Sequence, residues 1–209
     1  MKQEKISPRV IERLTKYLRC LENLNPEDYI SSEGLAEKMG FTAAQVRKDL
    51  SNFGEFGIRG KGYNIRKLHS DIEKILGVNK TNNIILVGVG RLGTALLSEP
   101  EFTKESFNIA GLFDKDEKKI GTEIMGKKIR DLKEIEHFTS SKEDIAMAII
   151  TVPKMAAQEV CDVLVKAGIK AILNFVPVKL DIPEGVVIEN IDLYGKLQEL
   201  NYWKERKLK

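Results

Sequence analysis

Apolar residues in the first third of the chain recur every three or four positions, the spacing of an α-helix with one buried face. The first such stretch begins at Ser7-Pro8, where a capping hydroxyl precedes a proline that suits the first helical position. Two shorter stretches follow, one capped by Ser31-Ser32 and ended by Gly40, and one opened by Thr42. Their apolar positions are Val10, Leu14, Tyr17, Leu18 and Leu21, then Leu35, Ala36 and Met39, then Val46, Leu50 and Phe53.

From residue 84 onward the pattern changes to short apolar runs that alternate with helical stretches. The runs are 84–87, 108–113, 145–150, 171–173 and 186–189, with a short strand also expected within 123–128. The helical stretches begin at 94 and occupy 131–138 and 156–167. This alternation is typical of a parallel sheet with right-handed crossovers. We therefore predict an α/β protein whose second part is a Rossmann-like parallel-sheet domain.

The domain boundary is expected near residue 80, because residues 77–82 are polar and lack periodicity. A short connecting helix is predicted just before it, over 69–76. At the other end, Leu193, Leu197, Leu200 and Trp203 have helical spacing and precede a basic tail. This last helix packs either on its own sheet or on a second subunit, and the sequence leaves both open. The predicted parts are residues 1–80, 81–191 and 192–209.

Polar residues on the third helix favour a nucleic-acid interface. Two short helices joined by a glycine-containing turn are typical of a helix-turn-helix, and Arg, Gln and Asn side chains suit base edges. Residues 53–65 then read as a β-hairpin, the wing of a winged-helix domain, whose tip cations reach phosphates or the minor groove. The candidate DNA-binding residues are Gln45, Arg47, Lys48 and Ser51 on the helix and Arg59, Lys61 and Tyr63 on the wing. The alternatives are a helical bundle with a solvated polar face, or a phosphate loop, which lacks its Lys-Ser/Thr ending.

A glycine-rich turn follows the run at 84–87. Gly88, Gly90 and Gly93 have dinucleotide-site spacing, with Val89, Arg91 and Leu92 between them. In such a site the first glycine allows the tight turn, the second lets a pyrophosphate approach the backbone, and the third lets helix and strand pack closely. The diphosphate is expected on the free amides of the helix N-terminus. Asp114, 21 residues after Gly93, is expected to bond the adenosine ribose hydroxyls. Three glycines also occur in ordinary tight turns. The interpretation therefore rests on the order of the surrounding elements, which is strand, glycine turn, helix, second strand and acidic residue.

Two further strand ends are candidates for the same site, because ligands bind at the carboxyl ends of parallel strands. These ends are Thr151-Val152-Pro153 and Asn174-Phe175. Val152 and Phe175 are suited to form an apolar surface for a nicotinamide ring. Ordinary punctuation of a strand by proline is the alternative explanation for each.

Composition and charge narrow the class of protein. Hydrophobic residues make up 42% of the 209 and charged residues 31%, as in an ordinary soluble protein. No apolar stretch approaches the roughly 20 residues that span a bilayer, and the first ten residues lack the apolar core of a signal peptide. Cys20 and Cys161 lack metal-ligand spacing, which favours a cytoplasmic location and no metal site. Residues 1–80 contain 15 Lys+Arg against 11 Asp+Glu, whereas the remainder has 19 against 20, which hints at a polyanion partner for the first part.

Taken together, the two halves resemble the redox-sensing transcriptional repressor Rex family over nearly the whole chain. The matching stretches are SSEGLAEKM at 31–39, QVRKDLSNFGEFGIRGKGY at 45–63, GVGRLG at 88–93, GIKAILNFVPV at 168–178 and ENIDL at 189–193. The resemblance implies a homodimer that binds a double-stranded inverted-repeat operator through winged-helix domains. It also implies NADH and NAD⁺ as ligands, with NADH releasing the protein from DNA, and a C-terminal helix exchanged between subunits.

The same resemblance implies a switch contact across the dimer. An Arg of the first helix, here Arg13, is expected to pair with an Asp before the exchanged helix, here Asp192. Some members carry a Tyr in this network where the present chain has Glu99.

Two alternatives remain at this point. An NAD-dependent oxidoreductase or CoA-binding ligase-like enzyme is possible on the same fold, but a catalytic acid or base is missing from the pattern, since His69 and His137 adjoin no nicotinamide loop. We therefore expect no catalytic residues and no enzyme activity. A sensor of NADP(H) is opposed by Asp114, although Lys115 keeps it open.

Overall fold

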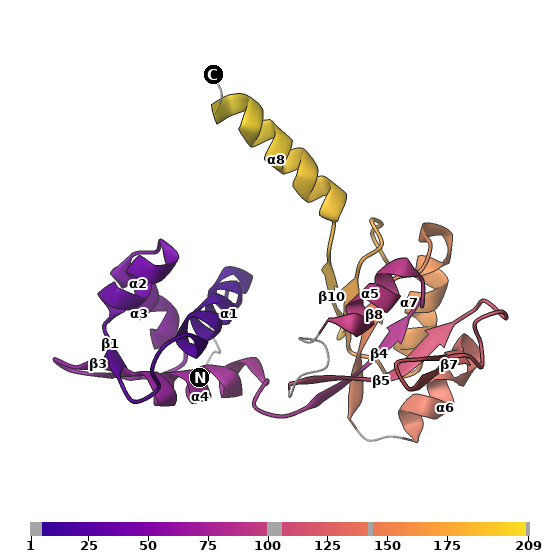
Figure 1. The fold of residues 1–209 in the computed structure, drawn as a ribbon, viewed down its shortest axis with the longest axis horizontal. Helices are drawn as coiled ribbons and strands as arrows, with labels where there is room; N and C mark the ends of the chain where they lie inside the picture. Colours follow the sequence, from indigo (N-terminus) through magenta and orange to yellow (C-terminus); the bar gives the residue numbers. More distant parts are fainter. Residues whose placement is uncertain (1–5, 100–105, 142–143, 208–209) are drawn as a thin grey trace. The chain divides into compact units, whose positions relative to one another are not determined.

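The computed structural model describes residues 6–99, 106–141 and 144–207, and the chain divides into two compact units, Met1–Lys80 and Thr81–Lys209 (Figure 1). The division falls inside the polar segment 77–82. Each unit has its own hydrophobic core.

The first unit combines four helices with a small antiparallel sheet. Its helices are α1 (Pro8–Glu22), α2 (Ser32–Met39), α3 (Ala43–Ser51) and α4 (Ile65–Leu76). Its strands are β1 (Tyr29–Ile30), β2 (Gly57–Ile58) and β3 (Gly62–Asn64), in the order β1-β3-β2. Strands β2 and β3 form the predicted wing, and the turn between them carries Arg59 and Lys61.

Side-chain caps fix where the short helices begin. Ser31 accepts a hydrogen bond from the Gly34 amide at the start of α2, and Thr42 accepts one from the Gln45 amide at the start of α3. Asn64 caps α4 in the same way. The prediction of a short connecting helix over 69–76 was wrong in its start. Helix α4 begins at Ile65, and its first turns belong to the core of the first unit.

That core is assembled from all four helices and the small sheet. In this core the buried stripe of α1 packs with those of α3 and α4, and Tyr63 of β3 is also buried in it. Its buried members are Leu14, Tyr17, Leu21, Ile30, Leu35, Ala36, Val46, Leu50, Tyr63, Ile65, Leu68 and Ile72. The sheet therefore positions the wing directly against the core that holds α3.

The second unit is built on a seven-stranded sheet. Its strands are β4 (Asn82–Val87), β5 (Phe107–Asp114), β6 (Glu123–Ile124), β7 (Lys127–Asp131), β8 (Ile145–Ile150), β9 (Ala171–Asn174) and β10 (Val187–Asn190). The order is β10-β9-β8-β4-β5-β7-β6, with every pair parallel except β6 with β7. Apart from the edge strand β6, this is the Rossmann order, and its switch point lies between β4 and β8. The predicted fold class is confirmed.

Helices cover the two faces of this sheet unequally. They are α5 (Arg91–Ser98), α6 (Ile135–Ser140) and α7 (Ala157–Lys166), with 3-10 turns at Leu132–Glu134 and Lys154–Ala156, whereas the last helix, α8 (Leu193–Lys207), projects away from the sheet (Figure 1). Ile85, Val87 and Ile150 point to the face that α6 and α7 cover. Ile84, Leu86 and Leu112 point to the opposite face, where α5 packs. The alternation along β4 explains why all four residues from Ile84 to Val87 are apolar.

Helix α8 exposes its apolar residues. Leu193, Leu197, Leu200 and Trp203 are each more than half exposed. The prediction that this helix is exchanged between subunits stays a prediction. Across the described residues we find no helix with the length and apolar character to cross a bilayer.

Candidate nucleic-acid interface and dinucleotide site

The glycine turn after β4 contains two positions that only glycine fits. Gly88 has φ of +100°, and a Cβ there would lie 2.7 Å from the Thr151 carbonyl carbon. A Cβ on Gly93 would overlap the Gly88 carbonyl oxygen and lie 3.0 Å from Thr151 Oγ1. These two glycines therefore let the chain turn sharply and let α5 pack against the strand ends, as their spacing predicts.

Gly90 differs from both of its neighbours in the motif. A Cβ there would meet no described atom within 4 Å, and its φ of −92° is open to any residue. Gly90 is the N-cap of α5, and the first backbone bond of the helix runs from the Thr94 amide to the Gly90 carbonyl. The amides of residues 91–93 precede that bond. The empty space over Gly90 and these amides fit the predicted pyrophosphate position.

Asp114 ties the glycine turn to the loop that follows β5. Its Oδ2 accepts hydrogen bonds from the Val89 amide and Lys119 Nζ, both at 2.9 Å, and its Oδ1 accepts one from the Asp116 amide at 3.0 Å. Burial alone raises the pKa of this carboxyl, but the Asp116 amide, the Lys119 ammonium and the Val89 amide together lower it. Asp114 is thus an ionised anchor of the turn, and its role in ribose binding stays a prediction.

Thr151 joins the ends of β8 and β4. Its hydroxyl donates to the Gly88 carbonyl oxygen at 2.6 Å, so the predicted residue does lie at the glycine turn. Pro153 lies two residues further on and begins the 3-10 turn before α7. Val152 and Phe175 pack with different clusters, Val152 on the α7 face and Phe175 on the α5 face. A common apolar surface made by these two residues therefore stays a prediction.

Asn174 has structural contacts at the end of β9. It is fully buried, and its amide nitrogen donates to the Val176 carbonyl at 2.9 Å and to Asn190 Oδ1 at 2.8 Å. Its amide oxygen accepts from the Val176 amide at 2.9 Å. The polar atoms of Asn174 are therefore directed at the strand ends of β9 and β10, where they fix the loop that carries Phe175, and a contact of Asn174 with the coenzyme stays a prediction.

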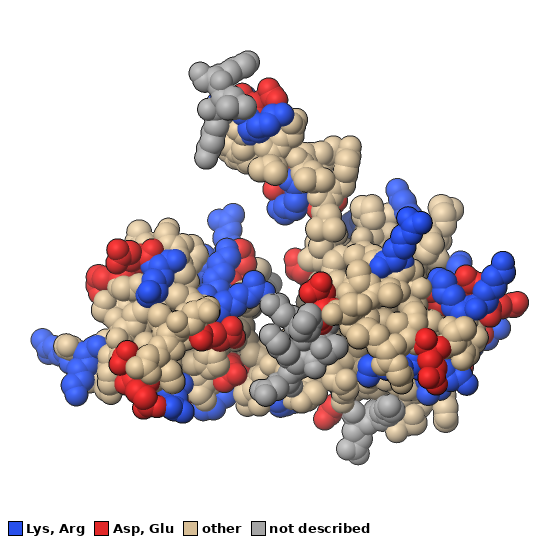
Figure 2. All heavy atoms as spheres, viewed as in Figure 1, with Lys and Arg blue, Asp and Glu red and all other residues tan. Residues whose placement is uncertain are grey.

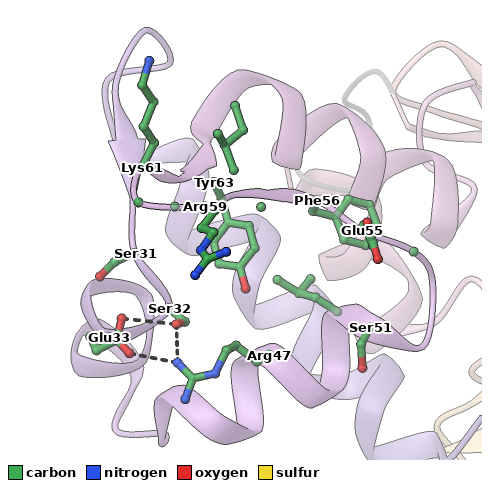
Figure 3. A pocket seen from close by; sticks show the side chains of 16 residues that line it. Ser31, Ser32, Glu33, Arg47, Ser51, Glu55, Phe56, Arg59, Lys61 and Tyr63 are labelled. Carbon is green, nitrogen blue, oxygen red and sulfur yellow. Dashed lines mark hydrogen bonds and ion pairs between the residues drawn. The ribbon is translucent and has the colours of Figure 1, made fainter.

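Five of the seven predicted DNA-binding residues line a groove of about 650 Å³ between α3 and the wing, and Gln45 and Lys48 lie outside its lining (Figure 3). Arg47 and Ser51 belong to the α3 side, and Arg59 and Lys61 to the wing side. Arg59, Lys61 and Lys48 are exposed. Figure 2 shows basic side chains gathered at the wing tip, near the β3 label of Figure 1.

Tyr63, Gln45 and Arg47 also contact other residues of the first unit. Tyr63 is 8% exposed and packs beneath Gly57, so only part of it faces the groove. The Gln45 amide donates to Asp49 Oδ1 at 2.7 Å. Arg47 Nη1 donates to Ser32 Oγ at 2.7 Å and to Glu33 Oε1 at 2.8 Å.

A buried acid on α3 was missed by the sequence reasoning. Asp49 is 1% exposed and accepts hydrogen bonds from Arg13 Nε at 2.5 Å, Arg13 Nη2 at 2.7 Å, Tyr17 Oη at 2.7 Å and the Gln45 amide. Burial raises the pKa of Asp49, but the bonds from Arg13, Tyr17 and Gln45 outweigh it and hold that pKa below its usual value. This network, which we call the Asp49 cluster, fastens α3 to α1.

The predicted switch residues have partners within the chain. Arg13 is held by Asp49 through Nε and Nη2, and its pairing with Asp192 of a second chain stays a prediction. Asp192 is exposed, and its Oδ1 accepts a hydrogen bond from the Gly195 amide at 2.8 Å at the start of α8. Glu99 follows α5 and is exposed. Among the described residues, no group of three or more His, Cys, Asp or Glu side chains is arranged to hold a metal ion.

Comparison with known proteins supports both halves of this picture. A family model described as "CoA binding domain" matches residues 79–178, and one described as "Putative DNA-binding protein N-terminus" matches residues 5–51. The redox-sensing transcriptional repressors Rex of Caldanaerobacter subterraneus subsp. tengcongensis and of Clostridioides difficile are each 44% identical over 199 residues. Each match covers 94% of this chain, and 88% and 94% of the respective relative.

Solved structures match over the same extent. A structure of RSP in complex with beta-NAD+ and operator DNA has a TM-score of 0.92 and 42% identity, and covers 98% of this chain and 95% of its own. A structure of RSP with beta-NADH has a TM-score of 0.86 and 40% identity, and covers 98% and 97%.

Proposed function

The chain belongs to the Rex family of redox-sensing transcriptional repressors, and from this premise we propose that it binds operator DNA and leaves it when NADH binds. NAD⁺ would permit DNA binding. The coenzyme part of the proposal rests on the glycine turn. At two of its glycines the neighbouring atoms leave no room for a side chain, and the third glycine is open to a ligand at a helix N-terminus. The DNA half is supported by the groove between α3 and the wing.

In the proposed complex, α3 lies in the major groove and the wing follows the backbone. The exposed Lys48 and the guanidinium of Arg47 suit base edges, while Arg59 and Lys61 suit phosphates. Gln45 is half-buried against Asp49, and Tyr63 mainly supports the wing. We propose direct DNA contacts for Arg47, Lys48, Ser51, Arg59 and Lys61, and supporting roles for Gln45 and Tyr63.

In the coenzyme site, the amides of Arg91, Leu92 and Gly93 would face the pyrophosphate, and Gly88 and Val89 shape the turn beneath it. Asp114 still has capacity for a ribose hydroxyl, because a carboxylate offers about four acceptor positions and three are used. Thr151, Val152 and Pro153 follow β8 at the switch point, and Asn174 and Phe175 lie at the end of the neighbouring strand β9.

The direction of the response follows from charge. The nicotinamide ring is cationic in NAD⁺ and neutral in NADH, and an unpaired charge is costly to bury in an apolar pocket. A pocket that closes over the ring therefore favours NADH. A ligand shifts a conformational equilibrium only through different affinities for the two states, so NADH would favour the closed state. In that state the two α3 helices of a dimer would no longer match the half-site spacing.

A homodimer on an inverted repeat is part of the proposal. The exposed apolar residues of α8 support its exchange with a second chain, since such a stripe is otherwise left in water. The Arg13–Asp192 contact would use Nη1 of Arg13, because Nε and Nη2 bond Asp49. A cytoplasmic location accords with this role and with the free thiols Cys20 and Cys161.

Enzyme activity is not favoured, because the relatives that match over most of their length are named as repressors. Sensing of NADP(H) has one observation in its favour. The exposed Lys115 and the half-exposed Lys119 lie beside Asp114, and cations there suit a 2′-phosphate.

The test is a titration of DNA-bound protein with four coenzymes. A labelled duplex is first selected from a random library by the full-length protein, and its anisotropy is then followed against NADH, NAD⁺, NADPH and NADP⁺. Release by NADH at concentrations where the other three leave the complex intact supports the proposal. Equal effects of NADH and NAD⁺ would end it.

A further inference from the structure

Glu33 of α2 restrains the one arginine on the outer face of α3. Arg47 Nη1 donates to Glu33 Oε1 at 2.8 Å and to Ser32 Oγ at 2.7 Å, and Ser32 Oγ lies 3.2 Å from Glu33 Oε2 (Figure 3). Ser32 is 8% exposed and belongs to the first turn of α2. The guanidinium is therefore held by two groups, one of which is fixed in the fold.

The contact uses only one end of the guanidinium. Among the residues that the structure describes, none accepts a hydrogen bond from Nε or Nη2 of Arg47. An arginine has five N–H donors in a rigid plane, so the Nε–Nη2 edge keeps three of them for another acceptor. That edge suits two adjacent acceptors, such as O6 and N7 of guanine. Glu33 thus fixes the plane of the Arg47 guanidinium and leaves its Nε–Nη2 edge free to bind a base.

Stability does not explain why an acid lies here. The Arg47 and Glu33 side chains are 56% and 68% exposed, and exposed ion pairs contribute little to folding. The hydrogen bonds to Glu33 from its own backbone amide and from Arg47 lower the pKa of this carboxyl, so it is charged at neutral pH. Glu33 also lines the groove that contains Arg59 and Lys61, where a negative charge opposes an approaching phosphate.

We propose that Glu33 is a positioning residue that sets operator specificity. It orients Arg47 toward a base edge, and its charge weakens the sequence-independent attraction of the groove for phosphates. Phosphates carry no sequence, so this repulsion lowers the affinity for every duplex alike, and the discrimination comes from the oriented Arg47. This inference rests on the proposed DNA-binding function.

The test compares two charge-removing variants of the same helix. E33Q removes the carboxylate that holds Arg47, and E37Q removes an exposed carboxylate of α2 that lies outside the groove. For each full-length protein, anisotropy gives the affinity for the duplex selected by the wild type and for a scrambled duplex of equal length, over a series of salt concentrations. Circular dichroism confirms that each variant is folded.

We expect E33Q to bind scrambled DNA more tightly than E37Q does, and to lose discrimination by roughly 5- to 100-fold, since a bidentate base contact accounts for about that ratio. R47K keeps the charge but lacks the planar fork, so it should lose a similar factor. Adding E33Q to R47K should then lower discrimination little further. A library selection repeated with E33Q should lose the preference at one base pair in each half-site.

Two outcomes would overturn the inference, and they differ in what else they overturn. If the wild type discriminates between the duplexes and E33Q keeps the ratio that E37Q keeps, Glu33 does not position Arg47, while the proposed function stands. If the wild type selects no duplex from the library, the proposed function fails and this inference fails with it.

Discussion

The glycine turn after β4 and the recognition surface of α3 encode their functions differently. In the turn, the information lies in the backbone, because Gly88 and Gly93 are defined by atoms that leave no room for a Cβ, and Gly90 by the space above it. On α3, the information lies in side chains, and two of the predicted readers, Gln45 and Arg47, are bonded to other residues of the first unit. A backbone motif can therefore be predicted from the spacing of its residues. The function of a side-chain surface can be predicted only when the hydrogen-bond partners of its side chains are known.

Distance along the chain explains the difference. The atoms that restrict Gly93 include the Gly88 carbonyl only five positions away, so local spacing carries that constraint. The partners of Asp49 on α1 lie 32 and 36 positions away, and Glu33 lies 14 positions from Arg47. No local pattern names such partners, because they depend on how the helices pack.

The burial of Asp49 could nonetheless have been predicted from the sequence. Val46, Leu50 and Phe53 define the buried stripe of α3, and Asp49 falls on the same stripe by helical spacing. A charged residue at a core position signals a paired charge, since an ionised group is rarely buried alone. The sequence reasoning placed only apolar residues on that stripe, and so it missed the acid and the arginine that pairs with it.

Other elements show the same dependence on local signals. Asn174 was assigned to the ligand because it ends a strand, and no local signal shows that the neighbouring loop and β10 take up its amide bonds. The strands, the glycine turn and the position of Asp114 were predictable because apolar runs and turn residues are local signals. The start of α4 was not, because the wing ends and the helix begins within the same few residues.

The largest expected effect is the loss of the Asp49 cluster. Asp49→Ala leaves Arg13 without its buried partner, and breaking a buried ion pair costs about 3–5 kcal/mol. We expect the free energy of unfolding of the first unit to fall by that amount in urea titrations monitored by circular dichroism. Glu37→Ala, an exposed acid of α2, is the control and should change it by less than about 0.5 kcal/mol. A similar small change for Asp49→Ala would show that the cluster is not a structural anchor.

Gly93→Ala and Gly90→Ala separate the two kinds of glycine. A methyl on Gly93 meets the Gly88 carbonyl, so we expect it to destabilise the second unit by about 1–3 kcal/mol, as overpacking does, and to weaken NADH binding. A methyl on Gly90 meets no described atom, so thermal stability should be kept while NADH affinity falls. Differential scanning calorimetry and NADH fluorescence measure the two properties. Full NADH affinity in Gly90→Ala would mean that the pyrophosphate does not approach this residue.

Acid should remove part of the difference between wild type and Asp49→Ala. The folded-state pKa of Asp49 is lowered, so its stabilisation is present above the usual aspartate pKa of about 3.9 and is lost as the pH falls through the lower folded-state value. Urea midpoints of both proteins from pH 7 down to pH 3 should therefore converge only below about pH 4. Convergence already at pH 6 would point to a different titrating group.

Substitutions in the wing should have the smallest effect on the free energy of unfolding, in contrast to the loss of the Asp49 cluster. Arg59 and Lys61 are exposed, so Arg59→Ala and Lys61→Ala should leave the free energy of unfolding unchanged within about 0.5 kcal/mol. Each is expected to weaken DNA binding and to lower the slope of log affinity against log salt concentration by about 1 for each lost phosphate contact. Anisotropy over a salt series, on selected and scrambled duplexes, measures both. Because phosphates carry no sequence, the two duplexes should lose affinity equally. A loss confined to the selected duplex would instead make the wing a reader of bases, and the division between base-reading α3 and phosphate-binding wing would fail.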